Sequence, residues 1–342
     1  MRVLLAGFGR VGRTVAELLA ERPRRPGLSA LDVSVVAITT GSHGALANPD
    51  GLNLAGALAE IRARGGFTAA HPDFATLDTL AALRTLDLEV LVELSPLSVA
   101  RRGEPAISHV REALRRRRHV VTANKGPLAW AYASLTKLAR EQGCALLHEA
   151  TVMDGAPVFN LVRRCLRGNV ILAIDGVLNS TTNVVLGELE RGASLPEALD
   201  AARRAGVVEA DPSDDLDGWD AAAKIAVLAN ALMGGDLTPE RVERESVRAV
   251  SPERMARASA RGCRLKMVCE VFREGGTVGG RVAARELPAG DPFAAIDGTS
   301  SVIRLATDIV GTLVIAENSP DLRTTAYGVL SDLLEVAEGV RR

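Results

Sequence analysis

Residues 7–12 read Gly-Phe-Gly-Arg-Val-Gly, and their setting constrains the fold more than any other stretch of the chain. A short apolar run from Val3 to Ala6 precedes them, which is typical of a buried strand. After them Val15, Leu18 and Leu19 recur at helical spacing. The pattern G-x-G-x-x-G between a strand and a helix is the fingerprint of a dinucleotide-binding βαβ unit.

Each glycine of this motif has its own predicted role. Gly7 permits the tight turn, Gly9 lets the backbone approach a pyrophosphate, and Gly12 lets the helix pack on the strand. The N–H groups at the start of the helix are available to the phosphates. The predicted cofactor loop also contains Phe8, Arg10 and Val11.

Strands and helices continue to alternate through the first half of the chain. We expect further strands at 32–38, 87–94, 119–123 and 143–150, with a helix over 106–118 between the second and third of them. Such alternation predicts an α/β fold with a Rossmann-like, doubly wound parallel sheet. Ligands bind these sheets at the carboxyl ends of the strands.

Two polar residues fall just past predicted strand ends. Ser95 follows the strand at 87–94, and Lys125 follows the strand at 119–123, in the sequence VVTANKGPLA. A lysine after a buried strand can be an ordinary solvated loop residue. The strand-end position instead predicts that Lys125 points toward the cofactor crevice.

The pattern changes near residue 151, where strands begin to follow one another without regular crossover helices. Residues 264–288 predict a hairpin of two strands. We therefore expect a dinucleotide-binding domain over 1–150 and an α+β catalytic and dimerisation domain over 151–315. The last helix, within 316–342, is expected to return to the first domain.

Composition and charge argue against several functional classes. The net charge is −1 and aromatic residues make up only 3%, so neither nucleic acid nor an anionic membrane is an expected partner. The basic run at 115–118 is expected to end a helix, where cations complement the helix dipole. We find no targeting signal and no apolar run near the ~20 residues of a membrane span. A cytoplasmic protein is expected, with reduced cysteines at 144, 165, 263 and 269.

The most unusual stretch is the acidic segment over residues 209–220, which contains six carboxylates. Its register does not match a calcium-binding EF-hand loop, which needs a glycine at the sixth position and a glutamate at the twelfth. The apolar helix that follows it carries Lys224 one turn after Asp220, so the two share a helix face. The six carboxylates are Glu209, Asp211, Asp214, Asp215, Asp217 and Asp220.

An exposed ion pair between Asp220 and Lys224 would contribute little to stability. The surrounding residues are apolar on every side, however, and such helices are buried. A lysine held beside an aspartate in a desolvated cleft is a candidate for proton transfer to a carbonyl oxygen. Together with the dinucleotide fingerprint, this arrangement predicts hydride transfer at a carbonyl carbon. Nearby carboxylates such as Asp215 would bind a substrate amino group.

These motifs resemble those of the homoserine dehydrogenase family, and the resemblance extends over nearly the whole chain. The family interconverts L-homoserine and L-aspartate 4-semialdehyde with NAD or NADP, on the route to threonine and methionine. The most specific resemblances are TANKGPLA and EADPSDDLDGWDAAAK. The others are GFGRVG, the wider segment 103–129, HEATVMDGAPVFNL and GVLNSTTNVVL.

The resemblance implies a role for each matching residue. Lys224 is similar to the acid/base lysine, with Asp220 beside it. Glu209 is similar to the ligand of the substrate amino group, and Lys125 to the lysine between nicotinamide and substrate. Ser95 matches a cofactor-contacting hydroxyl. Gly206 matches a glycine where the backbone approaches substrate and nicotinamide.

The resemblance also implies a structural Na⁺ and a homodimer formed through the second domain. The cation would be held by the backbone carbonyls of Glu149, Val152, Asp154 and Ala156. Two departures are expected to matter. Residues 316–326 (AENSPDLRTTA) replace the family's glycine-rich loop, and the chain ends without an ACT-type regulatory domain.

Cofactor preference depends on the end of the second strand. An NAD enzyme usually carries an acid there to bind the ribose 2′-hydroxyl. Residues 38–44 read ITTGSHG and contain none. This favours NADP slightly over NAD, with Arg10 or Arg13 reaching the 2′-phosphate.

Two alternatives remain from the residues alone. One is a dehydrogenase of the same fold that acts on another small amino-acid semialdehyde, because the 316–326 segment is altered. The other is a non-catalytic dinucleotide-binding protein, which would have no need for the charged groups at Lys125, Glu209, Asp220 and Lys224.

Overall fold

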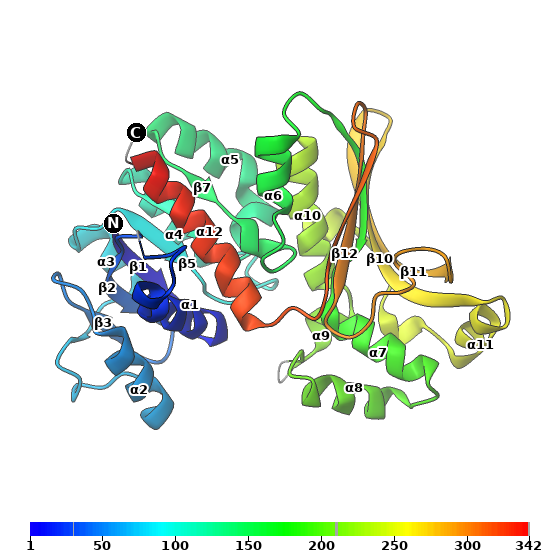
Figure 1. Ribbon diagram of the computed structural model, residues 1–342, viewed down its shortest axis with the longest axis horizontal. Helices are drawn as coiled ribbons and strands as arrows, with labels where there is room; N and C mark the ends of the chain where they lie inside the picture. Colours follow the sequence, from blue (N-terminus) through cyan, green and yellow to red (C-terminus); the bar gives the residue numbers. More distant parts are fainter. Residues whose placement is uncertain (30, 209–210, 341–342) are drawn as a thin grey trace. The chain divides into compact units, whose positions relative to one another are not determined.

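The computed structural model describes residues 1–29, 31–208 and 211–340, and these form two compact units (Figure 1). The first unit contains residues 1–127, 131–157 and the C-terminal segment from 322. The second contains residues 128–130 and 158–321.

The first unit is built on a sheet of order β4-β3-β2-β1-β5-β6-β7. The strands from β2 to β7 in this order are parallel, which confirms the doubly wound fold. The edge strands β3 and β4 run antiparallel, a feature that the alternating sequence pattern did not predict. The strands are β1 (Arg2–Ala6), β2 (Ser34–Thr39), β3 (Ala45–Ala47), β4 (Phe74–Ala75), β5 (Val90–Glu93), β6 (His119–Thr122) and β7 (Leu146–Leu147).

The strand predicted over 143–150 is therefore much shorter. It gives way to a 3-10 turn over Glu149–Thr151, because the Glu149 N–H donates to the buried side chain of Asp332 at 2.8 Å. The helices of this unit are α1 (Arg10–Glu21), α2 (Leu54–Arg64), α3 (Thr79–Thr85), α4 (Ala106–Arg115), α5 (Gly126–Gln142) and α12 (Leu322–Val340).

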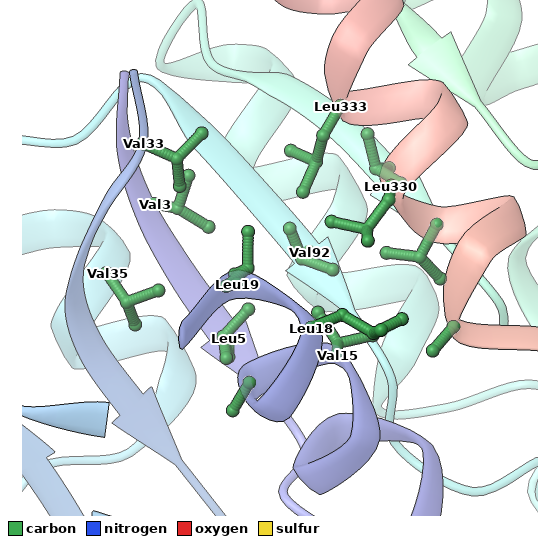
Figure 2. Close-up of a cluster of buried hydrophobic side chains, with 14 of the residues drawn as sticks. Val3, Leu5, Val15, Leu18, Leu19, Val33, Val35, Val92, Leu330 and Leu333 are labelled. Atoms are coloured by element: carbon green, nitrogen blue, oxygen red, sulfur yellow. The ribbon is translucent and has the colours of Figure 1, made fainter. Parts of the chain in front are cut away.

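The C-terminal helix completes the core of the first unit. Leu330 and Leu333 of α12 are fully buried in the same cluster as Val15 and Leu19 of α1 (Figure 2). Close approach of the α12 backbone depends on Gly328, where an added Cβ would lie 2.6 Å from the Asp154 carbonyl oxygen. The expected return of the last helix to the first domain is thus confirmed.

The second unit has a six-stranded sheet of order β13-β12-β8-β10-β11-β9. The predicted hairpin is present as β10 and β11, which pair antiparallel along their full length. Strands β12 and β13 form a second hairpin that the sequence analysis did not identify. The strands are β8 (Ile171–Val177), β9 (Glu243–Arg244), β10 (Cys263–Glu274), β11 (Thr277–Pro288), β12 (Ser301–Thr307) and β13 (Thr312–Glu317).

Helix α10 (Trp219–Met233) confirms the expectation of an apolar, buried helix, since nine of ten residues from Ala221 to Asn230 are buried and Lys224 is the exception. The segment after residue 155 is irregular, with α6 (Val158–Asn160) followed by a π turn over Leu161–Cys165. The other helices of this unit are α7 (Ser180–Glu190), α8 (Leu195–Arg204), α9 (Ser213–Leu216) and α11 (Pro252–Ala260), with 3-10 turns at Pro239–Arg241 and Val247–Ala249. In the first unit, a 3-10 turn at Arg22–Arg24 follows α1. Within the described residues, no helix combines the length and apolar character that crossing a membrane would require.

Candidate active site

The glycine loop between β1 and α1 has the geometry that its motif requires. Gly7 has φ +106°, and an added Cβ would lie 2.6 Å from the Leu94 carbonyl. At Gly12 an added Cβ would lie 2.4 Å from the Gly7 oxygen, so helix and turn are in direct contact. At Gly9 an added Cβ would meet no atom of the described chain within 4 Å. Two glycines therefore serve packing, and the third leaves the open space that a dinucleotide phosphate needs.

The side chains of the loop are divided between core and surface. Phe8 is buried, with its ring 5.6 Å from that of Phe67, so only its backbone remains for a phosphate. Arg13 donates from Nε to the Phe8 carbonyl at 3.1 Å and so braces the loop. Arg10 is exposed at the start of α1, and Val11 is partly buried.

The carboxyl ends of β1, β5 and β6 are level with one another, since Ala6 pairs with Glu93 and Glu93 with Thr122. Ser95 and Lys125 both lie just beyond this edge, as the strand-end argument predicted. Between β1 and β5 the order of the sheet reverses, which is where such folds bind ligands.

Asn124 joins the two turns that carry Ser95 and Lys125. Its Nδ2 donates to the Ser95 carbonyl at 2.9 Å, and its Oδ1 accepts from the Gly126 N–H at 2.8 Å. Lys125 is the first residue before α5 and is half-buried. Asn124 is a site residue beyond those predicted, although its place after a strand end gave the same signal as that of Lys125.

In the second unit, a cluster of charged side chains gathers at the start of α10. Lys224 Nζ lies 3.5 Å from Asp220 Oδ2, and both side chains are largely buried, at 16% and 17% exposed. The Lys224 ammonium also donates to the carbonyl of Leu178, just after β8. The predicted pairing along one helix face is present, and burial makes it more than a surface ion pair.

Asn179 and Thr181 bind the carboxylates of this cluster. The Asn179 amide donates to Asp215 Oδ1 at 2.8 Å and to Asp220 Oδ2 at 3.0 Å. The Thr181 hydroxyl lies 2.9 Å from Asp215 Oδ2 and 2.9 Å from the Val207 carbonyl. These two residues were not among the predicted site residues. Their position directly after β8 was the available signal.

This cluster perturbs the titration of the Asp215 carboxyl. Burial raises the pKa of Asp215 above its ordinary value, and the negative charge of Asp220 raises it further. The hydrogen bonds from Asn179 and Thr181 and the charge of Lys224 act in the opposite direction but do not outweigh burial. A cationic group that binds here would relieve the repulsion between the two carboxylates.

Two further candidates of this unit have different outcomes. Gly206 follows the end of α8 with φ +72°, a left-handed conformation that accounts for a glycine there without a ligand. Its approach to substrate stays a prediction. Glu209 lies outside the described residues.

The carbonyl segment over residues 149–156 is irregular and is tied to α12. Asp154 has φ +43°, and its Oδ1 accepts from the Thr325 hydroxyl at 2.6 Å. Ala156 donates its N–H to the Met153 carbonyl at 2.9 Å. In the second unit, the altered segment before α12 includes Ser319, which takes φ +48° without being a glycine.

Comparison with known proteins supports the same interpretation of both units. A family model described as "Homoserine dehydrogenase, NAD binding domain" matches residues 7–149, and one described as "Homoserine dehydrogenase" matches residues 157–334. A homoserine dehydrogenase of Methanocaldococcus jannaschii is 33% identical over the full length of both chains. The chain belongs to the homoserine dehydrogenase family.

Two other homoserine dehydrogenases carry information on cofactors. An NAD(+)-dependent homoserine dehydrogenase of Pseudomonas canavaninivorans is 32% identical, over 100% of this chain and 97% of that one. The solved structure of a hyperthermophilic archaeal homoserine dehydrogenase in complex with NADPH is 28% identical, with a TM-score of 0.84 and coverage of 99% and 98%.

Membership of the homoserine dehydrogenase family establishes the reaction. The protein is an NAD(P)-dependent oxidoreductase that interconverts L-homoserine and L-aspartate 4-semialdehyde. The two alternatives that the residues alone left open, another semialdehyde substrate and a non-catalytic binding protein, receive no support from these comparisons.

Proposed function

We propose that Lys224 is the general acid and base of this homoserine dehydrogenase. The observation that carries the proposal is the buried cluster in which Lys224 lies 3.5 Å from Asp220. When bound, the nicotinamide supplies or accepts the hydride. Lys224 then donates a proton to the aldehyde oxygen during reduction and takes it back from the hydroxyl during oxidation.

Asp220 keeps Lys224 in place and maintains its charge, because desolvation favours the neutral amine and a carboxylate beside the lysine favours the ammonium form. Asp215 and Glu209 bind the ammonium group of the substrate. The raised pKa of Asp215 supports this role, since a substrate ammonium would offset the like charge of Asp220. Gly206 brings backbone close to the substrate.

In the first unit, the glycine loop at 7–12 holds the pyrophosphate, and Ser95 contacts the dinucleotide. Lys125 binds the substrate carboxylate and assists the proton transfer. The link through Asn124 supports a common function for these two residues, because it fixes both turns at one edge of the sheet.

The test is the absorbance of reduced nicotinamide at its own band. Purified protein is mixed with L-homoserine and either NADP⁺ or NAD⁺, and the same assay is run on Lys224→Ala and Glu209→Ala. We expect the wild-type protein to give a homoserine-dependent rise in absorbance. Lys224→Ala should give no rise, and Glu209→Ala should give one only at high homoserine concentration. A normal turnover number in Lys224→Ala would remove the lysine from the mechanism.

We also propose NADP as the preferred cofactor. The end of β2 offers Thr40, Ser42 and His43 rather than an acid. Arg10 is exposed at the start of α1, the helix that follows β1, and β1 pairs with β2. Arg13 is a weaker candidate because it braces Phe8. A higher kcat/KM with NAD⁺ than with NADP⁺ in the same assay would contradict this preference.

A monovalent cation bound by the carbonyls of Glu149, Val152, Asp154 and Ala156 is a further proposal. The irregular course of this segment and its side-chain ties to α12 support it, since carbonyls become available as ligands where the backbone leaves helix and strand. Exchange of Na⁺ for a bulky organic cation at constant ionic strength should lower the melting temperature. An unchanged melting temperature would count against the site.

We propose that the protein is a homodimer that assembles through the second unit. Strands β8 and β13 and the connections beside them expose a group of apolar side chains that are between 46% and 71% exposed. Ile309→Glu should shift the mass in analytical ultracentrifugation toward the monomer, whereas a monomeric wild-type protein would contradict the proposal. The exposed apolar side chains of this group are Val170, Leu172, Ile309, Val310 and Val314.

A role in threonine and methionine biosynthesis and a cytoplasmic location stay predictions.

A further inference from the structure

A buried carboxylate lies at the carboxyl end of the central strand of the first unit. Glu93 ends β5 and is 0% exposed. Its Oε1 accepts from the hydroxyl of Ser95, and His109 of α4 approaches the same oxygen at 3.4 Å. Within the described chain, Oε2 is buried and has no hydrogen-bond partner. An acid in such a place costs free energy that an apolar residue would not, so it needs a functional explanation.

The hydrogen bonds of Ser95 provide that explanation. A serine hydroxyl has one hydrogen and two lone pairs. Its hydrogen is given to Glu93 Oε1, and Asn124 Nδ2 lies 3.3 Å from its oxygen as a donor. Toward any further group Ser95 can then act only as an acceptor. Without Glu93 the hydroxyl would be free to rotate.

The same turn lies against the dinucleotide loop. A Cβ added to Gly7 would come within 2.7 Å of the Ser95 N atom, so the loop and Ser95 are in direct contact. A chain of contacts therefore runs from His109 through Glu93 and Ser95 to Asn124. It touches the cofactor loop at Ser95 and ends at the turn that carries Lys125.

We propose that Glu93 is a positioning residue for cofactor binding, which fixes the Ser95 hydroxyl as an acceptor for a hydrogen-bond donor of the dinucleotide. The donor is either the carboxamide N–H of the nicotinamide or a ribose hydroxyl. The inference rests on the proposed function in one respect, the contact between Ser95 and the dinucleotide.

The test compares cofactor binding in Glu93→Leu and Glu93→Gln, by titration of NADPH fluorescence without substrate. Leucine fills the site without an acceptor, and should raise the Kd roughly fivefold to tenfold, the worth of one ordinary hydrogen bond. The Glu93→Gln variant keeps an acceptor at this position, and its Kd should lie near the wild-type value. In a Ser95→Ala background, Glu93→Leu should have no further effect, because it acts through Ser95.

Thr79→Val is the matched control, because it removes the buried 2.8 Å hydrogen bond between Thr39 and Thr79 in the same unit. It should lower the melting temperature and leave the Kd unchanged. Wild-type Kd values in Glu93→Leu, or an equal effect of Glu93→Leu with and without Ser95, would overturn the inference alone. If the wild-type chain bound neither NADPH nor NADH, the proposed function would fail with it.

A dinucleotide with an acetyl group in place of the carboxamide separates the two donors. If the carboxamide is the donor, Ser95→Ala should weaken NADPH binding but leave binding of this analogue unaltered. If a ribose hydroxyl is the donor, both should weaken alike. Should the Glu93 variants fail to fold, Ser95→Ala still decides, because unchanged binding of both dinucleotides would overturn the proposal.

Discussion

The two units prepare for the same reaction by different physical means. In the first, recognition is built from the backbone, since Gly7 and Gly12 pack where no side chain fits and Gly9 leaves open space. In the second, the proposed chemistry depends on charged side chains, with Lys224, Asp215 and Asp220 held in one buried cluster. A substitution in the glycine loop of the first unit should therefore act through steric fit. One in the second should act through charge, on turnover and pH dependence.

Lys224→Ala is the largest expected effect. Loss of a general acid lowers kcat by about 10² to 10⁴-fold, while binding of NADPH should remain close to wild type because the glycine loop is untouched. The measurement is a steady-state assay combined with a fluorescence titration. Lys137→Ala, on an exposed lysine of α5 paired with Glu141, is the control and should leave both values unchanged. A parallel loss of cofactor affinity in Lys224→Ala would show that the contrast between the units is wrong.

Asp215→Asn sharpens the comparison through charge alone. The loss of a carboxylate that binds the substrate ammonium should lower kcat/KM for homoserine by roughly tenfold to a hundredfold. The hydrogen bonds can survive, because the new amide can donate to Thr181 while Thr181 donates to the Val207 carbonyl. Kinetics across a range of homoserine concentrations measure the effect. A wild-type kcat/KM would exclude Asp215 from the substrate site.

The same variant makes a prediction about stability and pH. The folded state raises the pKa of Asp215, so its contribution to stability is present below the ordinary aspartate value of 3.8 and is lost as pH rises through the folded value. At pH 8 Asp215→Asn should therefore be more stable than wild type, by about 0.5–2 kcal/mol. This advantage should vanish in acid. Denaturant unfolding of both proteins at pH 8 and in acid tests the sign of this difference. A lower free energy of unfolding for Asp215→Asn than for wild type at pH 8 would contradict the prediction.

The last prediction compares two glycines of the dinucleotide loop. Gly12→Ala should destabilise the protein by about 1–3 kcal/mol, because its Cβ would lie 2.4 Å from the Gly7 oxygen. Gly9→Ala should change stability by less than about 0.5 kcal/mol, because its Cβ meets no described atom within 4 Å. It should nevertheless weaken NADPH binding. Equal melting temperatures for the two variants would refute the division between packing and binding glycines.

Much of the fold could be predicted because it depends on local patterns. The G-x-G-x-x-G motif, the alternation of strands with helices and the hairpin at 264–288 all correspond to observed elements. The antiparallel edge strands β3 and β4 were missed because strands of two or three residues carry too short a pattern to detect. The long strand expected at 143–150 ended early because its backbone bonds to Asp332, which lies 183 residues from Glu149.

The candidate site divides in the same way. Asp220 and Lys224 could be paired from sequence because helix geometry alone brings residues i and i+4 together. Ser95 and Lys125 could be placed because parallel strands end at one edge. Asn179, Thr181 and Glu93 could not be assigned roles in advance. Their partners in the site lie 16 to 41 residues away, in contacts that no local period encodes. Only the pairing of Glu93 with Ser95 and the capping of α7 by Asn179 are local among the contacts described for these residues.

The sequence by itself determined the dinucleotide loop, the acid–lysine pair and the family, since each depends on residues close together in the chain or on motifs of fixed spacing. Only the tertiary structure decided which polar groups support them. It bound Asp215 and Asp220 to one asparagine, raised the pKa of Asp215 by burial, and directed the Ser95 hydrogen to a buried carboxylate. Desolvation and the direction of a hydrogen bond depend on what surrounds an atom in space, and folding alone creates those surroundings.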